Sequence, residues 1–290
     1  MITYEIEYPP QDLLSSHDLV HVLKFWNQDS NGEWVLKTKV LNPHGINVPV
    51  TDILAAPLSV NKSQGCLTSD NNGGLKYWSF QETANNWCLS KVSLPNFNHY
   101  SNSVALAWSR DGSLIFHAFD DKMTIIEFAH FGKFVGEGDN NTLNELTLDS
   151  PIQSMKLIND TNLIIATHNT LNAVNLLLGT IVKSFDLYPY VNGVYKSGHL
   201  DRLIACDEKS GRIALVINQK LKSHDSKTEL SYRSRVLIFN SDLSARLGVY
   251  THNDYISCIS WNYDTDFIFM DTQCRLGVVS TTTNTEIADE

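Results

Sequence analysis

Histidine offers the widest choice of chemistry among the residues of this chain, because its ring can serve as an acid, a base or a metal ligand. The 290 residues include ten histidines, and His17 and His21 lie four positions apart. That spacing brings two rings together on a helix, but the surrounding residues have the pattern of a β-strand. No carboxylate or cysteine is spaced to complete a metal site with them. We therefore expect surface or loop histidines and no bound metal ion.

Three other histidines recur in similar surroundings. His44, His99 and His252 each precede an aliphatic, strand-like run by a few residues. An active site needs a catalytic group once, whereas a repeated structural unit needs its buried polar contacts in every copy. The recurrence therefore favours a structural role for these rings over acid–base catalysis.

Carboxylates are the second group that could do chemistry. The pairs Asp120–Asp121 and Asp207–Glu208 fall at turns between apolar runs. A glycoside hydrolase requires two carboxylates that converge at about 5 to 9 Å, and acids in turns are usually solvated. The sequence has no motif for a phosphate loop, a dinucleotide site, a nucleophile elbow or a zinc protease. We expect neither catalytic residues nor a cofactor.

Charge limits the partners of the chain. The formal net charge is −10 and the sequence pI is near 5.4, whereas a domain that holds nucleic acid through its phosphates usually shows a basic stripe. We therefore expect any RNA contact to be confined to one basic edge. The densest basic stretch contains Lys220, Lys222, Lys227, Arg233 and Arg235.

Cysteine usage and hydropathy bear on the compartment. The five cysteines are scattered and form no C-x-x-C pair, which is typical of a reducing compartment and predicts neither disulfides nor a zinc site. No apolar run approaches the roughly 18 residues that a membrane span needs.

Short strands are the elements that would position these residues. Runs of Val, Ile, Leu, Phe and Tyr alternate with Asn, Asp, Ser and Gly turns. Residues 99–128 and 252–280 share one order: a histidine, an aliphatic run, Trp108 or Trp261, a polar turn and further strands. Units of about 40 to 50 residues with several strands each are typical of β-propeller blades.

The strand groups predict one propeller domain over residues 1–290. It should begin and end inside blades, as a fragment of a longer protein, and the intact domain should have about six to seven blades. The polar stretch from Asn218 to Ser234 should be an exposed loop that interrupts the fourth complete blade. The expected blades are three strands within 1–42, complete blades at 43–97, 98–143, 150–188 and 190–250, and a partial blade from 251.

The recurring residues resemble the WD-repeat pattern. In that family a His, a Ser or Thr, an Asp and a Trp form a buried hydrogen-bonded network within a blade. The resemblance implies an all-β, WD-repeat-like β-propeller. The matching residues are His44, Thr68 or Ser69, Asp70 and Trp78 in one blade, His99 and Asp120 in the next, and His252 in the last.

A closer resemblance covers about residues 20 to 136. Its marks are Asn-Pro-His at 42–44, the G-x-L-K-x-W strand at 73–78, the Trp87–Cys88 pair, and S-x-D-G-S-L at 109–114. These features resemble the second propeller of a WD-repeat UTP-A (t-UTP) subunit of the small-subunit processome, of the type called U3 small nucleolar RNA-associated protein seventeen. Members carry two tandem propellers and a C-terminal tail, so the chain would be the second propeller only.

The resemblance implies a non-catalytic scaffold in the nucleolus. UTP-A subunits support pre-rRNA transcription and processing toward 18S rRNA in ribosome biogenesis. The implied partners are other UTP-A subunits, with the pre-rRNA 5′ external spacer and the U3 particle reached indirectly or through limited contacts. No membrane and no small-molecule substrate is implied. The alternatives are a generic WD-repeat adaptor, such as a ubiquitin ligase receptor or coat subunit, and a propeller hydrolase with acids at a central channel.

Some side chains could contact a partner directly. Tyr and Trp are enriched at interaction hot spots, but we expect Trp26, Trp34 and Trp87 to pack within blades. A connection such as residues 95–100 should be partly exposed. The candidate contact residues are Phe97, Tyr100, Lys220, Lys222 and Arg233.

Overall fold

The computed structural model describes 22 β-strands and one short helix, grouped in two compact units of residues 1–145 and 146–290. The strands of each sheet pair antiparallel, as in β2 with β3 and β17 with β18. No helix in the described part has the length and apolar character that crossing a membrane would require. The described residues are 1–7, 19–57, 64–93, 100–101, 103–129, 131, 142–191, 202–207, 209–221, 231–262 and 266–280.

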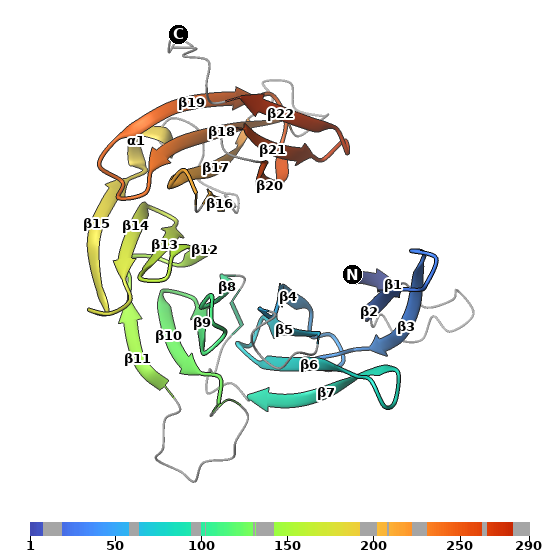
Figure 1. Cartoon of the computed structure of the whole chain (residues 1–290). Helices are drawn as coiled ribbons and strands as arrows, with labels where there is room; N and C mark the ends of the chain where they lie inside the picture. Colours follow the sequence, from blue (N-terminus) through green and yellow to red (C-terminus); the bar gives the residue numbers. More distant parts are fainter. Residues whose placement is uncertain are drawn as a thin grey trace. The chain divides into compact units, whose positions relative to one another are not determined.

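The first unit holds three sheets (Figure 1). A three-stranded sheet has the order β1-β2-β3, and two four-stranded sheets have the orders β4-β5-β6-β7 and β8-β9-β10-β11. The end of β11 crosses into the second unit. The strands are β1 (Ile2–Glu7), β2 (Val20–Gln28), β3 (Trp34–Leu41), β4 (Val50–Ala55), β5 (Gly65–Asp70), β6 (Leu75–Gln81), β7 (Asn86–Ser93), β8 (Val104–Trp108), β9 (Leu114–Phe119), β10 (Lys122–Glu127) and β11 (Thr142–Thr147).

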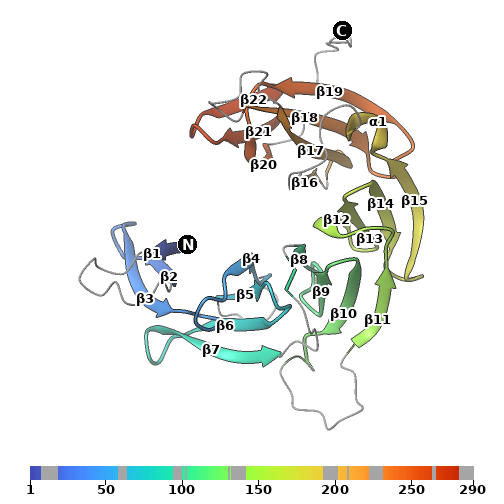
Figure 2. The ribbon, with the colours of Figure 1, turned by 180° about the vertical axis from the view of Figure 1, so that it is seen from behind.

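The second unit also holds three sheets (Figure 2). Two four-stranded sheets, β12-β13-β14-β15 and β16-β17-β18-β19, precede the three-stranded sheet β20-β21-β22. The elements are β12 (Ile152–Asn159), β13 (Asn162–Thr167), β14 (Thr170–Asn175), β15 (Thr180–Asp186), α1 (Tyr188–Val191), β16 (Arg202–Asp207), β17 (Arg212–Leu221), β18 (Ser231–Asn240), β19 (Arg246–His252), β20 (Ile256–Asn262), β21 (Asp266–Asp271) and β22 (Leu276–Ser280).

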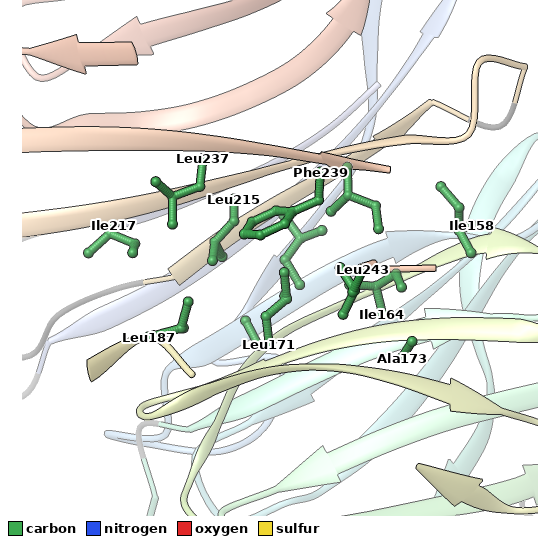
Figure 3. Close-up of a cluster of buried hydrophobic side chains, with 13 residues drawn as sticks. Ile158, Ile164, Leu171, Ala173, Leu187, Leu215, Ile217, Leu237, Phe239 and Leu243 are labelled. Carbon is green, nitrogen blue, oxygen red and sulfur yellow. The ribbon is translucent and has the colours of Figure 1, made fainter. Parts of the chain in front are cut away.

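Inner strands bury both faces, which explains their continuous apolar runs. On β17, Leu215 and Ile217 pack in a cluster with Leu171 on β14 and Leu187, which directly follows β15, as Figure 3 shows. Val216, which points to the opposite face, packs in a second cluster with residues of β20 and β21. Burial on two faces removes the apolar–polar alternation that marks a half-buried strand.

The first unit has equivalent clusters between neighbouring sheets. One gathers Tyr77, Trp108 and Phe128, and another gathers Phe25 and Trp87, whose rings stack with centroids 4.6 Å apart. Trp87 is buried, as expected for blade packing, whereas Trp34 on the edge strand β3 is 48% exposed.

Three boundaries differ from the sequence-based expectation. The third sheet continues past residue 143, because β11 ends at Thr147. The predicted loop from Asn218 to Ser234 is wrong at both ends, since β17 runs to Leu221 and β18 begins at Ser231. Polar residues suggested a loop, but Asn218 and Ser234 are buried and hydrogen-bonded to the backbone of Ile256.

Candidate functional site

A hydrogen-bonded chain of four side chains lies in the second sheet of the first unit. Trp78 on β6 donates its indole N–H to Thr68 Oγ1 on β5 at 2.9 Å. The Thr68 hydroxyl lies 2.8 Å from Nε2 of His44, and Nδ1 of the same ring lies 2.7 Å from Oδ2 of Asp70. The bonds are mutually consistent if His44 is neutral with its proton on Nδ1. Of the two candidate residues, Thr68 provides the hydroxyl of this network, while the Ser69 hydroxyl pairs with that of Thr51 at 3.0 Å.

Asp70 also organises the turn that follows β5. Its Oδ1 accepts the backbone N–H groups of Asn72 and Gly74 at 2.8 and 2.9 Å. Burial opposes ionisation of this carboxyl, but the bonds from His44, Gly74 and Asn72 outweigh that effect and lower its pKa below the usual value. The carboxylate therefore fixes the turn and holds the His44 ring in place.

The last sheet contains a related network around Asp271. His252 Nε2 lies 3.2 Å from Asp271 Oδ2, and Arg275 Nε donates to the same oxygen at 2.6 Å. Arg275 Nη2 also reaches Asp254 Oδ2 at 3.3 Å. Burial raises the pKa of Asp271, but hydrogen bonds from Arg275, His252 and Gln273 outweigh it and bring the value to about 2. His252 therefore contacts a carboxylate, as His44 does.

The two carboxylates share one turn geometry. Asp271 Oδ1 accepts the N–H groups of Gln273 and Arg275, at the same two offsets along the chain as in the Asp70 turn. Gly73 and Cys274 both adopt a left-handed conformation, with φ of 79° and 59°. The networks differ beyond the turn, because the second recruits Arg275 where the first has a glycine.

The third sheet departs from the expected network. His99 lies outside the described residues. Asp120 begins the turn after β9 with a left-handed φ of 60°. Phe119 pairs with Val104, as Asp70 pairs with Val50. The register therefore gives the network position to Phe119 rather than to Asp120.

His117 on β9 takes the place that Thr68 has on β5, two residues before the end of the strand. It is 4% exposed, and its Nε2 has no hydrogen-bond partner in the described part of the chain. Burial lowers the pKa of His117 to about 4, against a smaller opposing effect of the Asp70 charge. The ring is therefore neutral at physiological pH.

The tryptophans of the sequence repeat fall at different positions. Trp78 lies on the third strand of its sheet, whereas Trp108 and Trp261 lie on first strands. Trp261 donates to the backbone oxygen of Ala205 at 3.0 Å, across to the preceding sheet. Trp108 packs against Tyr77 and Phe128. The tryptophans that follow the histidines in the sequence repeat therefore occupy two different structural positions, one on a third strand and one on first strands.

The other histidine expectation needs one correction. His17 lies outside the described residues, but His21 is 4% exposed rather than at the surface. Its Nδ1 lies 2.6 Å from the Tyr4 hydroxyl, and burial lowers its pKa. Among the described residues, no group of three or more His, Cys, Asp or Glu side chains could hold a metal ion.

Of the five candidate contact residues, the structure describes the side chains of two. Tyr100 is 74% exposed, and Arg233 on β18 is also exposed. Lys220 belongs to β17 by its backbone, while Phe97 and Lys222 lie outside the described residues.

The sequence patterns did not point to Asp271, Asp254 or Asn218 as members of these networks. Asp271 offered a signal, because it ends an apolar strand and precedes a short turn, as Asp70 does. Asp254 and Asn218 gave none, since their partners are 21 and 38 residues away.

Solved structures identify the fold. The crystal structure of Saccharomyces cerevisiae Sqt1 matches with a TM-score of 0.60 and 11% identity, over 92% of this chain and 68% of that one. The WD40 domain of Neurospora crassa Pan2 matches with a TM-score of 0.54 and 14% identity, over 95% and 74%. The chain has a WD40-type β-propeller fold. The prediction of an all-β, WD-repeat-like propeller is confirmed.

One curated relative of this WD40 chain is much more similar in sequence. NET1-associated nuclear protein 1 of Saccharomyces cerevisiae is 65% identical over 291 residues, which cover 100% of this chain and 32% of the relative. The chain thus spans about a third of that protein's length. No protein-family model matches the chain.

Proposed function

We propose that this chain is a non-catalytic WD-repeat scaffold, and that it serves in the UTP-A subcomplex of the small-subunit processome during ribosome biogenesis. The non-catalytic part rests on one observation: the histidine and aspartate side chains that could act as acids or bases are hydrogen-bonded to each other. His44 and Asp70 are engaged with each other, and His252 and Asp271 are likewise joined. Groups held in buried bonds to one another stabilise turns and are poorly placed to meet a substrate.

The nuclear part of the proposal rests on the relative that shares 65% identity. Its name describes a nuclear protein associated with NET1. Because the identity extends over the whole of this chain, we place the chain in the nucleus and count a NET1-like protein among its candidate partners. The processome part rests on the sequence resemblance over residues 20–136, which adds the nucleolus, other UTP-A subunits and indirect contact with pre-rRNA.

The surface offers groups suited to protein contacts. Trp34, Leu177 and Tyr100 are exposed by 48%, 80% and 74%. Exposed large apolar and aromatic side chains are the kind that anchor protein interfaces. We propose that such residues meet partner subunits and that the propeller acts as a rigid support for them.

Affinity purification tests this function. The full protein containing this chain is tagged and expressed in yeast, and bound proteins and RNA are identified by mass spectrometry and sequencing, with an untagged strain as control. Recovery of UTP-A subunits with U3 RNA and pre-rRNA is expected. Recovery of ubiquitin ligase or coat components without any UTP-A subunit would replace the proposal with the adaptor alternative.

A further inference from the structure

An acid-free stretch of sheet stands out in this acidic chain. Strands β17, β18 and β19 contain no Asp or Glu, although the whole chain has 32 acidic against 22 basic residues. The same strands carry Arg212, Lys220, Arg233, Arg235 and Arg246. Positive charge is therefore concentrated in one sheet of the second unit.

Arg233 and Arg235 share one face of β18. Successive side chains alternate between faces, and Leu237 and Phe239, at the following odd positions, lie in the cluster that Figure 3 shows. Val236, at an even position, lies in the cluster on the opposite face. The two arginines thus lie on the same face of β18 as Leu237 and Phe239, next to the buried cluster but outside it.

Neutral side chains surround this pair in the sheet register. Arg235 lies between Ile217 on β17 and Thr251 on β19, and Arg233 lies opposite Gln219. The Gln219 amide donates to the backbone oxygen of Tyr190, at 2.5 Å. No carboxylate of these strands can therefore neutralise either guanidinium.

Three other arginines of this unit are already engaged. Arg275 binds Asp271 and Asp254, Arg246 donates to the Tyr190 hydroxyl, and Arg202 donates to the backbone oxygen of His168. By contrast, the guanidinium groups of Arg233 and Arg235 make no hydrogen bond or ion pair with any residue in the described part of the chain. Arg235 is also half-buried, and a guanidinium with reduced access to water gains most from an external anion.

We propose that Arg233 and Arg235 bind an acidic, extended segment of a partner protein. Alternate side chains of an extended peptide are about 6.6 Å apart, which is also the spacing of two arginines on alternate positions of a strand. Two carboxylates at alternate positions can therefore meet both guanidinium groups. A net charge of −10 disfavours a long polyanion such as RNA but accommodates a short acidic segment. This inference rests on the scaffold function, to which it adds one docking surface and the chemistry of its partner.

Fluorescence anisotropy tests the surface directly. The probe is a labelled 12-residue peptide of alternating Glu and Thr, compared with the same peptide carrying Gln for Glu and with a 12-nucleotide oligouridylate. The 290-residue chain should bind the Glu peptide in preference to both, with affinity that falls as salt rises. In the double variant Arg233→Gln/Arg235→Gln, the affinity for the Glu peptide should fall by at least about tenfold, since charge-assisted bonds to both arginines are lost.

Two variants control this experiment. Lys37→Gln/Lys183→Gln removes the same charge from β3 and β15, and it should leave peptide binding unchanged. Arg233→Lys/Arg235→Lys keeps the charge without the forked geometry and should retain part of the affinity. Unchanged far-UV circular dichroism of the glutamine variant would show that it is folded.

Three outcomes would overturn the inference: no binding of the Glu peptide, equal binding by the glutamine variant, or tighter binding of oligouridylate, which would assign the surface to RNA. None of these results would contradict the proposed scaffold function. That proposal depends on the purification of UTP-A subunits.

Discussion

His44 and Asp70 are 26 residues apart in the sequence, yet the ring Nδ1 of one lies 2.7 Å from a carboxylate oxygen of the other. His44 precedes the second sheet, and Asp70 ends its second strand. Their bond therefore ties the entrance of the sheet to the turn after β5. Because Thr68 and Trp78 extend this hydrogen-bonded network, the connection before the sheet, β5 and β6 are linked to one another.

Replacing Asp70 with alanine should destabilise the first unit. The substitution leaves His44 and the N–H groups of Asn72 and Gly74 without their acceptor, so the free energy of unfolding should fall by about 3 kcal/mol. Urea denaturation followed by tryptophan fluorescence measures the change. The exposed Glu82 provides the control, and Glu82→Ala should alter stability by less than about 0.5 kcal/mol. Equal effects of the two substitutions would contradict the role given to Asp70.

Thr68 and Trp78 should be energetically coupled. Trp78→Phe removes the indole N–H but keeps an aromatic ring, and Thr68→Val removes the hydroxyl that accepts it. In a double-mutant cycle, the coupling energy should be about 0.5 to 1.5 kcal/mol, the usual net value of one hydrogen bond. Strictly additive effects would show that the 2.9 Å contact contributes nothing to stability.

His117 should make stability depend on pH. Burial lowers its pKa to about 4, whereas an unfolded histidine titrates near 6.5. Between these values the unfolded state binds a proton that the folded state does not, so stability is full above about pH 6.5 and is lost as the pH falls toward 4. The loss attributable to this ring is roughly 3 kcal/mol.

The variant His117→Gln isolates that contribution. It has no titrating group at this position, so its stability should change less than that of the parent chain between pH 6.5 and 4. Part of the slope should persist, because burial also lowers the pKa of His21 and His168. Denaturation midpoints at several pH values give both slopes, and identical slopes would be incompatible with a buried neutral His117.

Asn218 should be important for the second unit despite lying in a polar stretch. Its amide donates to the backbone oxygen of Ile256 at 3.0 Å and accepts the N–H of the same residue at 3.1 Å. Asn218→Ala removes the donor to the Ile256 oxygen and leaves Ser234 Oγ as the side-chain acceptor for the Ile256 N–H, so it should cost about 2 kcal/mol in unfolding free energy. The exposed Asn253 is the matched control, since Asn253→Ala should change stability by less than about 0.5 kcal/mol. A neutral Asn218→Ala would show that these bonds contribute nothing to stability.

Local sequence patterns predict the strand groups and much of the first network. Three strands within residues 1–42 follow from local alternation of apolar and polar residues, which depends only on near neighbours in the chain. His44, Asp70 and Trp78 were singled out by a recurring pattern, and the structure brings them together through Thr68. Strand period and turn residues are local properties, so one sequence is enough to predict them.

Other features depend on contacts between residues that are far apart in the chain. Cross-strand register gave Phe119, instead of Asp120, the position equivalent to Asp70. Burial of Asn218 depends on Ile256, 38 residues further along, so its polarity alone suggested a loop. A buried polar group is stable only when a partner meets it, and the chain must fold before that partner is within reach.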